Sequence, residues 1–177
     1  MKKSYIAILF ISLLSTSAVA AEESSPEQTV SSLWQSLSRE PESKPDVKTL
    51  KQILHPEAKI FGSFYNEEEP QLHIITTDAF IQSLNKTFET GFYECEVRRQ
   101  VQKHDRFAQV YSMVESRGEK DSNKPDFIGI NSIQLYKNDD QWQIVSLYYH
   151  IDEDSIETLY DSKLSGQCLQ NKQTTEH

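Results

Sequence analysis

Two long runs near the end of the chain, residues 127–137 and 141–151, predict a β-hairpin. Both runs are rich in β-branched and aromatic residues, and Asn138-Asp139-Asp140 between them has the composition of a tight turn. Two earlier runs with the same period of two cover residues 92–102 and 107–117. Because the connections between successive runs are short and polar, we predict a meander of four antiparallel strands.

Helical patterns occupy most of the first half of the chain. Ser25-Pro26-Glu27-Gln28 is a capping-box sequence, and apolar residues follow it at helical spacing, namely Val30, Leu33, Trp34 and Leu37. We predict further elements as follows: helices from Asp46 to just before Pro56, from residues 76–78 to near Gly91 and within residues 154–164, and strands at 58–65 and 72–75. Helices followed by consecutive antiparallel strands indicate an α+β fold.

The first 20 residues have the pattern of a bacterial signal peptide. Lys2 and Lys3 precede a short apolar run, and Ala18-Val19-Ala20 resembles a cleavage site. The apolar run is shorter than the roughly 20 residues that span a bilayer. We therefore expect an exported protein, periplasmic or secreted, with one domain over residues 21–165 and a flexible tail over residues 166–177.

The net charge and the two cysteines limit the partners and the compartment. The formal charge is −9, and removal of residues 1–20 deletes two lysines and no acids, which gives −9 − 2 = −11. Such a charge repels nucleic-acid phosphates and anionic lipids, so neither nucleic acid nor, after signal removal, a membrane is an expected partner. Export would permit a disulfide between Cys95 and Cys168, although the sequence leaves open whether they meet.

Several segments resemble the nuclear transport factor 2-like superfamily, also called the SnoaL-like or cystatin-like cone fold. The resemblance covers roughly residues 28–152 and rests on Gly129–Leu135, Trp142–Ser146, Glu94–Arg99, Ala108–Arg117 and His55–Ala58. It implies a curved antiparallel sheet that wraps around N-terminal helices and forms a cone with a pocket. Members of this superfamily range from isomerases and dehydratases to subunits that only bind or dimerise, so the resemblance implies no single activity.

Candidate site residues follow from chemistry and from strand alternation. His150 and Glu94 could act as acid or base, although a strand-end histidine and a salt-bridged outer carboxylate are the simpler interpretations. On a regular strand Trp142, Tyr148 and His150 would share one face. The residues that could contact a ligand are Trp34, Tyr111, Asn131, Trp142 and Tyr148. The sequence contains no cluster with metal-ligand spacing and no nucleotide-binding or nucleophile motif, so we expect no metal and no cofactor.

Three functions remain open from the sequence. The first is binding of a small apolar or aromatic molecule in the cone pocket, which a pocket rich in aromatic residues favours. The second is an isomerase, dehydratase or hydrolase-like activity that uses an acid or base in the cone. The third is a non-catalytic interaction module that forms a homodimer through one face of the sheet.

Overall fold

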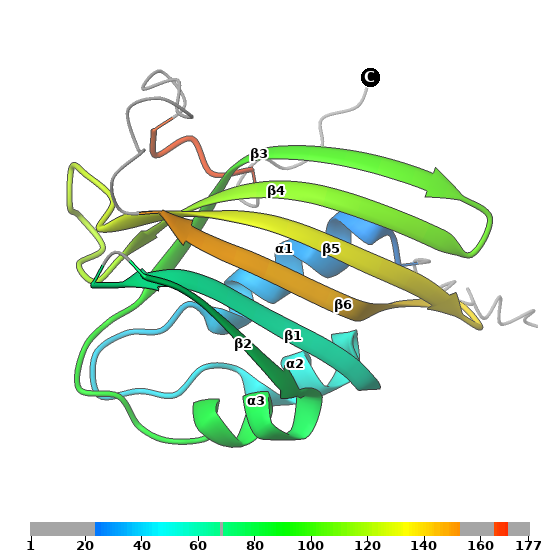
Figure 1. Ribbon diagram of the computed structural model, residues 1–177, viewed down its shortest axis with the longest axis horizontal. Helices are drawn as coiled ribbons and strands as arrows, with labels where there is room; N and C mark the ends of the chain where they lie inside the picture. The colour runs from blue at the N-terminus through cyan, green and yellow to red at the C-terminus, as the bar shows by residue number, and fades with distance from the viewer. Residues whose placement is uncertain (1–23, 68, 153–164, 170–177) are drawn as a thin grey trace, which may run out of the picture.

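The computed structural model describes residues 24–67, 69–152 and 165–169 (Figure 1). The helices are α1 (Pro26–Leu37), α2 (Val47–Ile53) and α3 (Thr77–Leu84). The strands are β1 (Leu54–Asn66), β2 (Glu69–Thr76), β3 (Tyr93–His104), β4 (Phe107–Arg117), β5 (Phe127–Asn138) and β6 (Gln141–Asp152). The predicted signal peptide, the helix expected within residues 154–164 and the tail from residue 170 lie outside the described residues.

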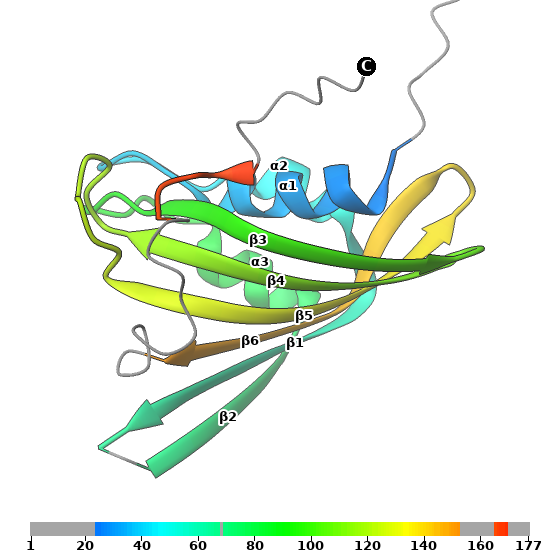
Figure 2. The ribbon, with the colours of Figure 1, turned by 90° about the horizontal axis from the view of Figure 1, so that it is seen from above.

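The six strands form one curved sheet in the order β2-β1-β6-β5-β4-β3. Strands β3 to β6 are the predicted antiparallel meander, and the α+β class is confirmed. The sheet is nevertheless mixed, because β1 pairs in parallel with β6. Figure 2 shows the sheet bending around the helices. We call the helix-covered side the inner face and the opposite side the outer face.

Local sequence signals locate the starts of the helices, whereas two of the helix ends differ from the prediction. The predicted capping box at α1 is confirmed, because the Gln28 amide donates to Ser25 Oγ at 3.1 Å and the Ser25 amide donates to Gln28 Oε1 at 2.8 Å. Helix α2 ends before the predicted position, because Leu54 already pairs with β6. Helix α3 also ends early, at Leu84, well before Gly91.

The main hydrophobic core lies between the helices and the inner face. Its fully buried side chains come from both layers and include Leu33, Leu50, Leu54, Ile60, Ile133, Leu135 and Ile144. Each such side chain stabilises the fold by roughly 1.5–3 kcal/mol relative to exposure. Among the described residues, no helix combines the length and the apolar character needed to cross a membrane.

Two β-bulges decide which side chains face inward. Val97 is an extra residue on β3, because Glu96 and Arg98 pair with the consecutive residues Val114 and Met113. Each bulge reverses the alternation of side chains along its strand.

The second bulge lies at Val145 on β6, because Ile144 and Ser146 pair with the consecutive residues Leu135 and Gln134. Trp142 and Ile144 are therefore buried on the inner face, whereas Tyr148 is exposed on the outer face. The expectation that Trp142, Tyr148 and His150 share one face is wrong, because it assumed a regular strand.

A buried ion pair joins α1 to the edge strand β3. The Glu96 side chain is fully buried and accepts hydrogen bonds from Arg99 Nε at 3.0 Å and from Ser112 Oγ at 2.6 Å, and it also pairs with Arg99 Nη2. The Arg99 guanidinium donates in addition to the Glu27 carbonyl at 3.0 Å and to Ser31 Oγ at 2.8 Å on α1. We call this group of contacts the helix clamp.

A disulfide attaches the last described segment to the sheet. Cys95 on β3 and Cys168 are bonded, with their Cα atoms 4.9 Å apart and a sequence separation of 73. On the chain-entropy model a loop of this length stabilises the fold by about 4 kcal/mol. The bond attaches Cys168, which lies within the tail predicted for residues 166–177, to Cys95 in the sheet.

The helix clamp gives a stability prediction. We expect Arg99→Met to lower the free energy of unfolding by about 3 kcal/mol, because the buried Glu96 carboxylate loses its cationic partner. Arg98→Met is the matched control, since Arg98 is exposed, and we expect a change below about 0.5 kcal/mol. Urea unfolding of both variants measures the difference. Equal stabilities of the two variants would contradict the role of the clamp.

Candidate functional site

An apolar cavity of about 230 Å³ lies between the helices and the inner face of the sheet. Helices α1 and α3 contribute one wall, and strands β3 to β6 contribute the other. Its apolar lining consists of Trp34, Leu37, Phe80, Leu84, Phe92, Val114, Phe127, Leu147, Tyr149 and Ile151. Its polar side chains are Glu94, Ser116 and Asn131. We call this space the inner cavity.

Glu94 supplies a titratable group in the wall of the inner cavity. Its carboxylate accepts a hydrogen bond from Ser116 Oγ at 2.7 Å, and its backbone amide donates to Ser38 Oγ at 2.9 Å at the end of α1. Burial raises the pKa of Glu94 to about 7, although the Ser116 hydrogen bond and the charge of Arg39 both act to lower it. A carboxyl group with this pKa can give or take a proton near neutral pH.

Trp34 and Asn131 bring two more side chains with polar atoms to the lining of the same cavity. Trp34 Nε1 is buried and has no hydrogen-bond partner within the described part of the chain. The Asn131 amide nitrogen donates to the carbonyls of Ser112 and Gly129, both at 3.2 Å, so the amide oxygen is the atom available to a ligand. A buried donor without a partner costs free energy, and Trp34 Nε1 is such a donor on a side chain that lines the cavity.

Three of the residues selected from the sequence meet in this cavity. Trp34 on α1, Glu94 on β3 and Asn131 on β5 all line it, although they are far apart in the chain. Trp142, which was expected to contact a ligand, belongs instead to the main core and is 4% exposed. Its backbone amide donates to Ser24 Oγ and its carbonyl accepts from Thr29 Oγ1, so Trp142 holds the start of α1.

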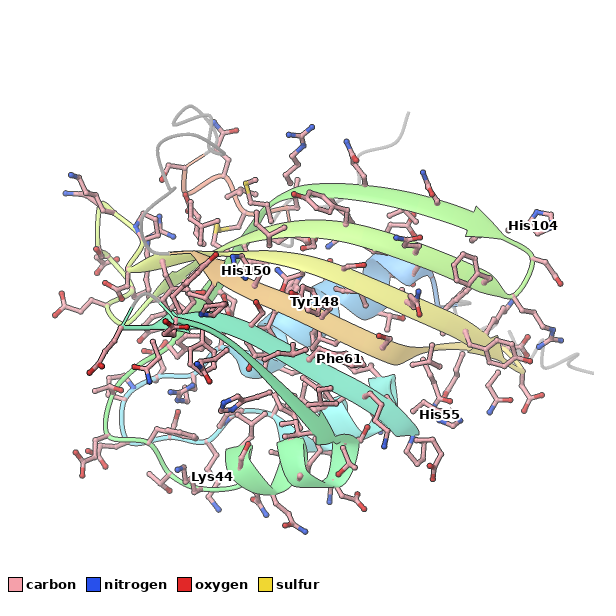
Figure 3. The ribbon with its side chains drawn as sticks, in the orientation of Figure 1. Lys44, His55, Phe61, His104, Tyr148 and His150 are labelled. Atoms are coloured by element: carbon pink, nitrogen blue, oxygen red, sulfur yellow. A yellow bond between two sulfur atoms is a disulfide. The ribbon has the colours of Figure 1, made fainter. Side chains whose placement is uncertain are left out.

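The other three selected residues lie on the outer face, away from the inner cavity. His150 and Tyr148 follow the bulge on β6, and Tyr111 is exposed on β4. The His150 ring shares a hydrogen bond of 2.7 Å with Ser63 Oγ. Tyr148 packs near the Phe61 ring, on the side of the sheet opposite the helices (Figure 3). The strand alternation used for the sequence prediction could not detect this separation.

Tyr149 is a cavity residue that sequence reasoning missed. It lies between the outward Tyr148 and His150, and its ring crosses β1 where Gly62 has no side chain. A Cβ atom at Gly62 would lie 2.4 Å from the Tyr149 hydroxyl oxygen, so this glycine is required for the close approach. The glycine within a strand was the available signal, because such glycines often mark a close contact.

Within residues 24–67, 69–152 and 165–169, no group of three or more His, Cys, Asp or Glu side chains is arranged to hold a metal ion. The inner cavity instead combines an apolar lining with the side chains of Trp34, Asn131 and Glu94. This arrangement is suited to a small organic ligand whose body is apolar and whose polar atoms are few.

Solved structures with a similar fold identify the architecture of the chain. A protein with a cystatin-like fold from Nostoc punctiforme PCC 73102 has a TM-score of 0.55 and 14% identity over 72% of this chain and 89% of its own. An NTF2-like protein from Silicibacter pomeroyi DSS-3 has a TM-score of 0.50 and 17% identity over 71% and 92%. The chain has the nuclear transport factor 2-like fold. The resemblance predicted from sequence is therefore confirmed for the fold.

A third nuclear transport factor 2-like structure, from Shewanella baltica OS155, has a TM-score of 0.50 and 15% identity over 71% of this chain and 90% of its own. All three proteins are described as being of unknown function. No protein-family model matches the sequence, and neither does a curated protein. The nuclear transport factor 2-like fold thus accounts for the curved sheet around the helices. The function has to be argued from the residues that line the inner cavity.

The raised pKa of Glu94 predicts how stability depends on pH. Between pH 4.5, the usual pKa of a glutamate, and about 7, the folded state holds a proton that the unfolded state has lost. Folding stability from this group therefore falls as pH rises through that window and stays low above it.

Replacing Glu94 by its neutral counterpart tests this dependence. We expect Glu94→Gln to be more stable than wild type at pH 8, by up to about 3 kcal/mol and less where solvent reaches the carboxyl. The advantage should shrink toward pH 5. Urea unfolding at several pH values measures it, with the exposed Glu119→Gln as control. Parallel pH curves for wild type and Glu94→Gln would contradict the raised pKa.

Proposed function

We propose that the mature protein is exported and binds a small, neutral, largely apolar molecule that carries a hydrogen-bond acceptor. The observation that supports this most directly is the buried Trp34 Nε1, which has no partner among the described residues and belongs to a side chain of the inner cavity. A ligand acceptor at this nitrogen would remove the cost of the unpartnered donor.

The lining and the volume restrict the class of ligand. A charged ligand would lose its hydration against a mostly apolar wall, which is unfavourable without a fixed countercharge. The cavity of about 230 Å³ has the volume of roughly eight water molecules in the liquid. These two limits favour a compact neutral compound with one or two rings and a carbonyl or ether oxygen.

A pair of matched probes tests the role of Trp34. Acetophenone and ethylbenzene have similar shapes, and only acetophenone carries a carbonyl acceptor. One buried hydrogen bond contributes about 1 kcal/mol, which corresponds to about a fivefold change in a dissociation constant. We therefore expect the preference for acetophenone over ethylbenzene to be about fivefold larger in wild type than in Trp34→Phe. Thermal-shift titration at constant pH gives both constants.

A second variant distinguishes the inner cavity from other binding surfaces. Gly129 lines the cavity, and the nearest atom to an added Cβ would be 3.6 Å away, so Gly129→Leu should enter the space without a backbone clash. We expect this variant to lose binding of both probes. Unchanged binding in Gly129→Leu, or an unchanged probe ratio in Trp34→Phe, would overturn the proposed site.

Export is supported by the signal-peptide pattern of residues 1–20. If the full chain is produced in a bacterial host, the protein recovered from the periplasm should begin at Ala21. Intact-mass measurement of the periplasmic fraction checks this. A chain that retains residues 1–20 and stays in the cytoplasm would contradict export.

Self-association is a second proposed property, and the outer face supports it. Two neighbouring rows of paired residues cross all six strands there. One row is Ile74, Phe61, Tyr148, Ser132, Tyr111 and Gln100, and the other is Leu72, Ser63, His150, Ile130, Met113 and Arg98. Neither row contains an acidic residue, although the chain has a net charge of −9. Two copies could therefore approach through this face with less repulsion than elsewhere.

The two rows give a test of self-association. We expect wild type to sediment as a dimer and Tyr148→Lys to sediment as a monomer, because the substitution places a charge at the centre of the apolar rows. Tyr136→Lys is the control, since Tyr136 is exposed on β5 outside both rows. Sedimentation velocity compares the three proteins. A wild-type monomer at high concentration would exclude the dimer.

A further inference from the structure

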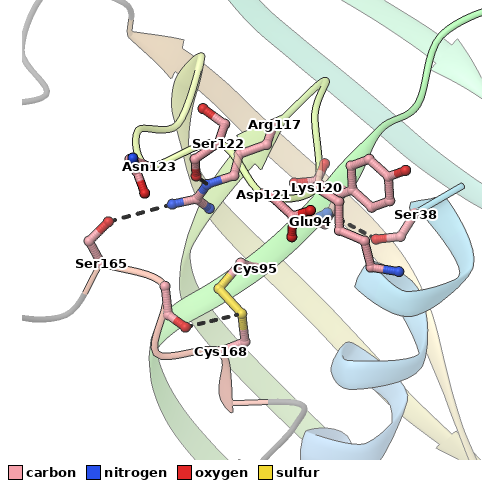
Figure 4. A pocket seen from close by; sticks show the side chains of 12 residues that line it. Ser38, Glu94, Cys95, Arg117, Lys120, Asp121, Ser122, Asn123, Ser165 and Cys168 are labelled. Atoms are coloured by element: carbon pink, nitrogen blue, oxygen red, sulfur yellow. Dashed lines mark hydrogen bonds between the residues drawn. A yellow bond between two sulfur atoms is a disulfide. The ribbon is translucent and has the colours of Figure 1, made fainter. Parts of the chain in front are cut away.

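A second, polar cavity lies beside the edge strand β3, where residues 165–169 approach the sheet (Figure 4). We call these residues the C-terminal segment. The cavity has a volume of about 490 Å³, and its wall includes Arg117, Ser165 and both cysteines of the disulfide. Cys168 is partly exposed, whereas Cys95 is 6% exposed. Cys168 is therefore the more exposed of the two bonded cysteines, and it borders the cavity.

Besides the disulfide, two hydrogen bonds join the C-terminal segment to an ion pair on the sheet. The Gly166 amide donates to Glu115 Oε2 at 3.0 Å, and Arg117 Nη2 reaches Ser165 Oγ at 3.5 Å. Glu115 and Arg117 themselves form an ion pair of 2.7 Å, with side chains 0% and 8% exposed. A buried pair of this kind on the outer face can separate and hydrate once its cover is removed.

The C-terminal segment also meets a small apolar cluster. Cys168 packs against Cys95, Val97, Met113 and Ile128, all of which are buried on the outer face. Further along the same face Tyr148 is 38% exposed. The cluster therefore differs from Tyr148 in being covered, and the disulfide links it covalently to the segment that contains Cys168.

We propose that the Cys95–Cys168 disulfide is a redox-controlled latch that fixes the C-terminal segment over the apolar cluster and the Glu115–Arg117 pair. Its release needs a dithiol. One thiolate of the dithiol attacks the Cys168 sulfur, the Cys95–Cys168 bond breaks, and Cys95 leaves as a thiolate that is then protonated. The second thiol attacks the mixed disulfide and frees Cys168. The dithiol is oxidised to a cyclic disulfide, and the two protons and two electrons that it loses reduce Cys95 and Cys168 to thiols.

Release of the latch changes the surface and leaves the fold in place. The helix clamp and the inner cavity involve no residue of the C-terminal segment. Met113 and Ile130 of the cluster region also belong to the proposed self-association rows. Reduction therefore enlarges the apolar surface of the outer face. An effect of reduction on dimerisation rests on the proposed self-association, whereas the latch itself does not.

The test uses the chain from Ala21 to His177, with dithiothreitol as the dithiol. Hydrogen exchange measured by mass spectrometry should show loss of amide protection in residues 165–169, with retained protection in α1 and β5. Binding of an apolar fluorescent dye should rise, and reoxidation should reverse both changes. Cys168→Ser and Cys95→Ser should show the released state without dithiothreitol and should not respond to it.

Three results would overturn the latch. If dithiothreitol makes the two cysteines reactive toward an alkylating reagent only after denaturation, the disulfide is inaccessible in the folded protein. If the reduced protein keeps protection in residues 165–169, other contacts hold the segment. If reduction removes protection in α1 and β5 as well, the disulfide is a staple of the whole fold and no local switch exists.

Discussion

The buried contact between Glu96 and Arg99 fixes helix α1 to the edge of the sheet, and the inner cavity depends on that attachment. A carboxylate inside a protein is stable only when its charge and its lone pairs are satisfied. Arg99 and Ser112 satisfy Glu96, and the remaining guanidinium hydrogens reach Glu27 and Ser31 on α1. Trp34 lies one turn beyond Ser31, so the clamp also positions the indole that forms one wall of the cavity.

The clamp exists because β3 is irregular. Residues three apart on a regular strand point to opposite faces, so Glu96 and Arg99 could not meet without the extra residue Val97. The bulge at Val145 has the complementary effect on β6, because it turns Tyr149 toward the inner cavity and Tyr148 toward the outer face. The extra residue in each of these two strands thus decides which of the following side chains face the inner cavity and which face outward.

Local patterns in the sequence were sufficient for much of the fold. The capping box at Ser25 and the four-strand meander depend on near neighbours, and both were predicted correctly. The parallel pairing of β1 with β6 depends on residues about ninety positions apart, for which the sequence carries no local signal.

Part of the candidate site could likewise be predicted from the sequence, and part could not. Trp34, Glu94 and Asn131 were selected for their chemistry and line the cavity. Tyr149 was missed, and Tyr148, which was selected as a ligand contact, lies on the outer face, because alternation cannot reveal a bulge.

We propose that ligand binding occurs in the inner cavity through Trp34, and the two tryptophans of the chain allow a direct measurement. In a ¹H–¹⁵N correlation spectrum each indole gives one signal. During titration with acetophenone, we expect the Trp34 indole signal to shift while that of Trp142, packed in the main core, stays in place. A stationary Trp34 signal, together with shifts at the amides of Tyr111 and Tyr148, would instead place binding on the outer face and exclude the inner cavity as the site.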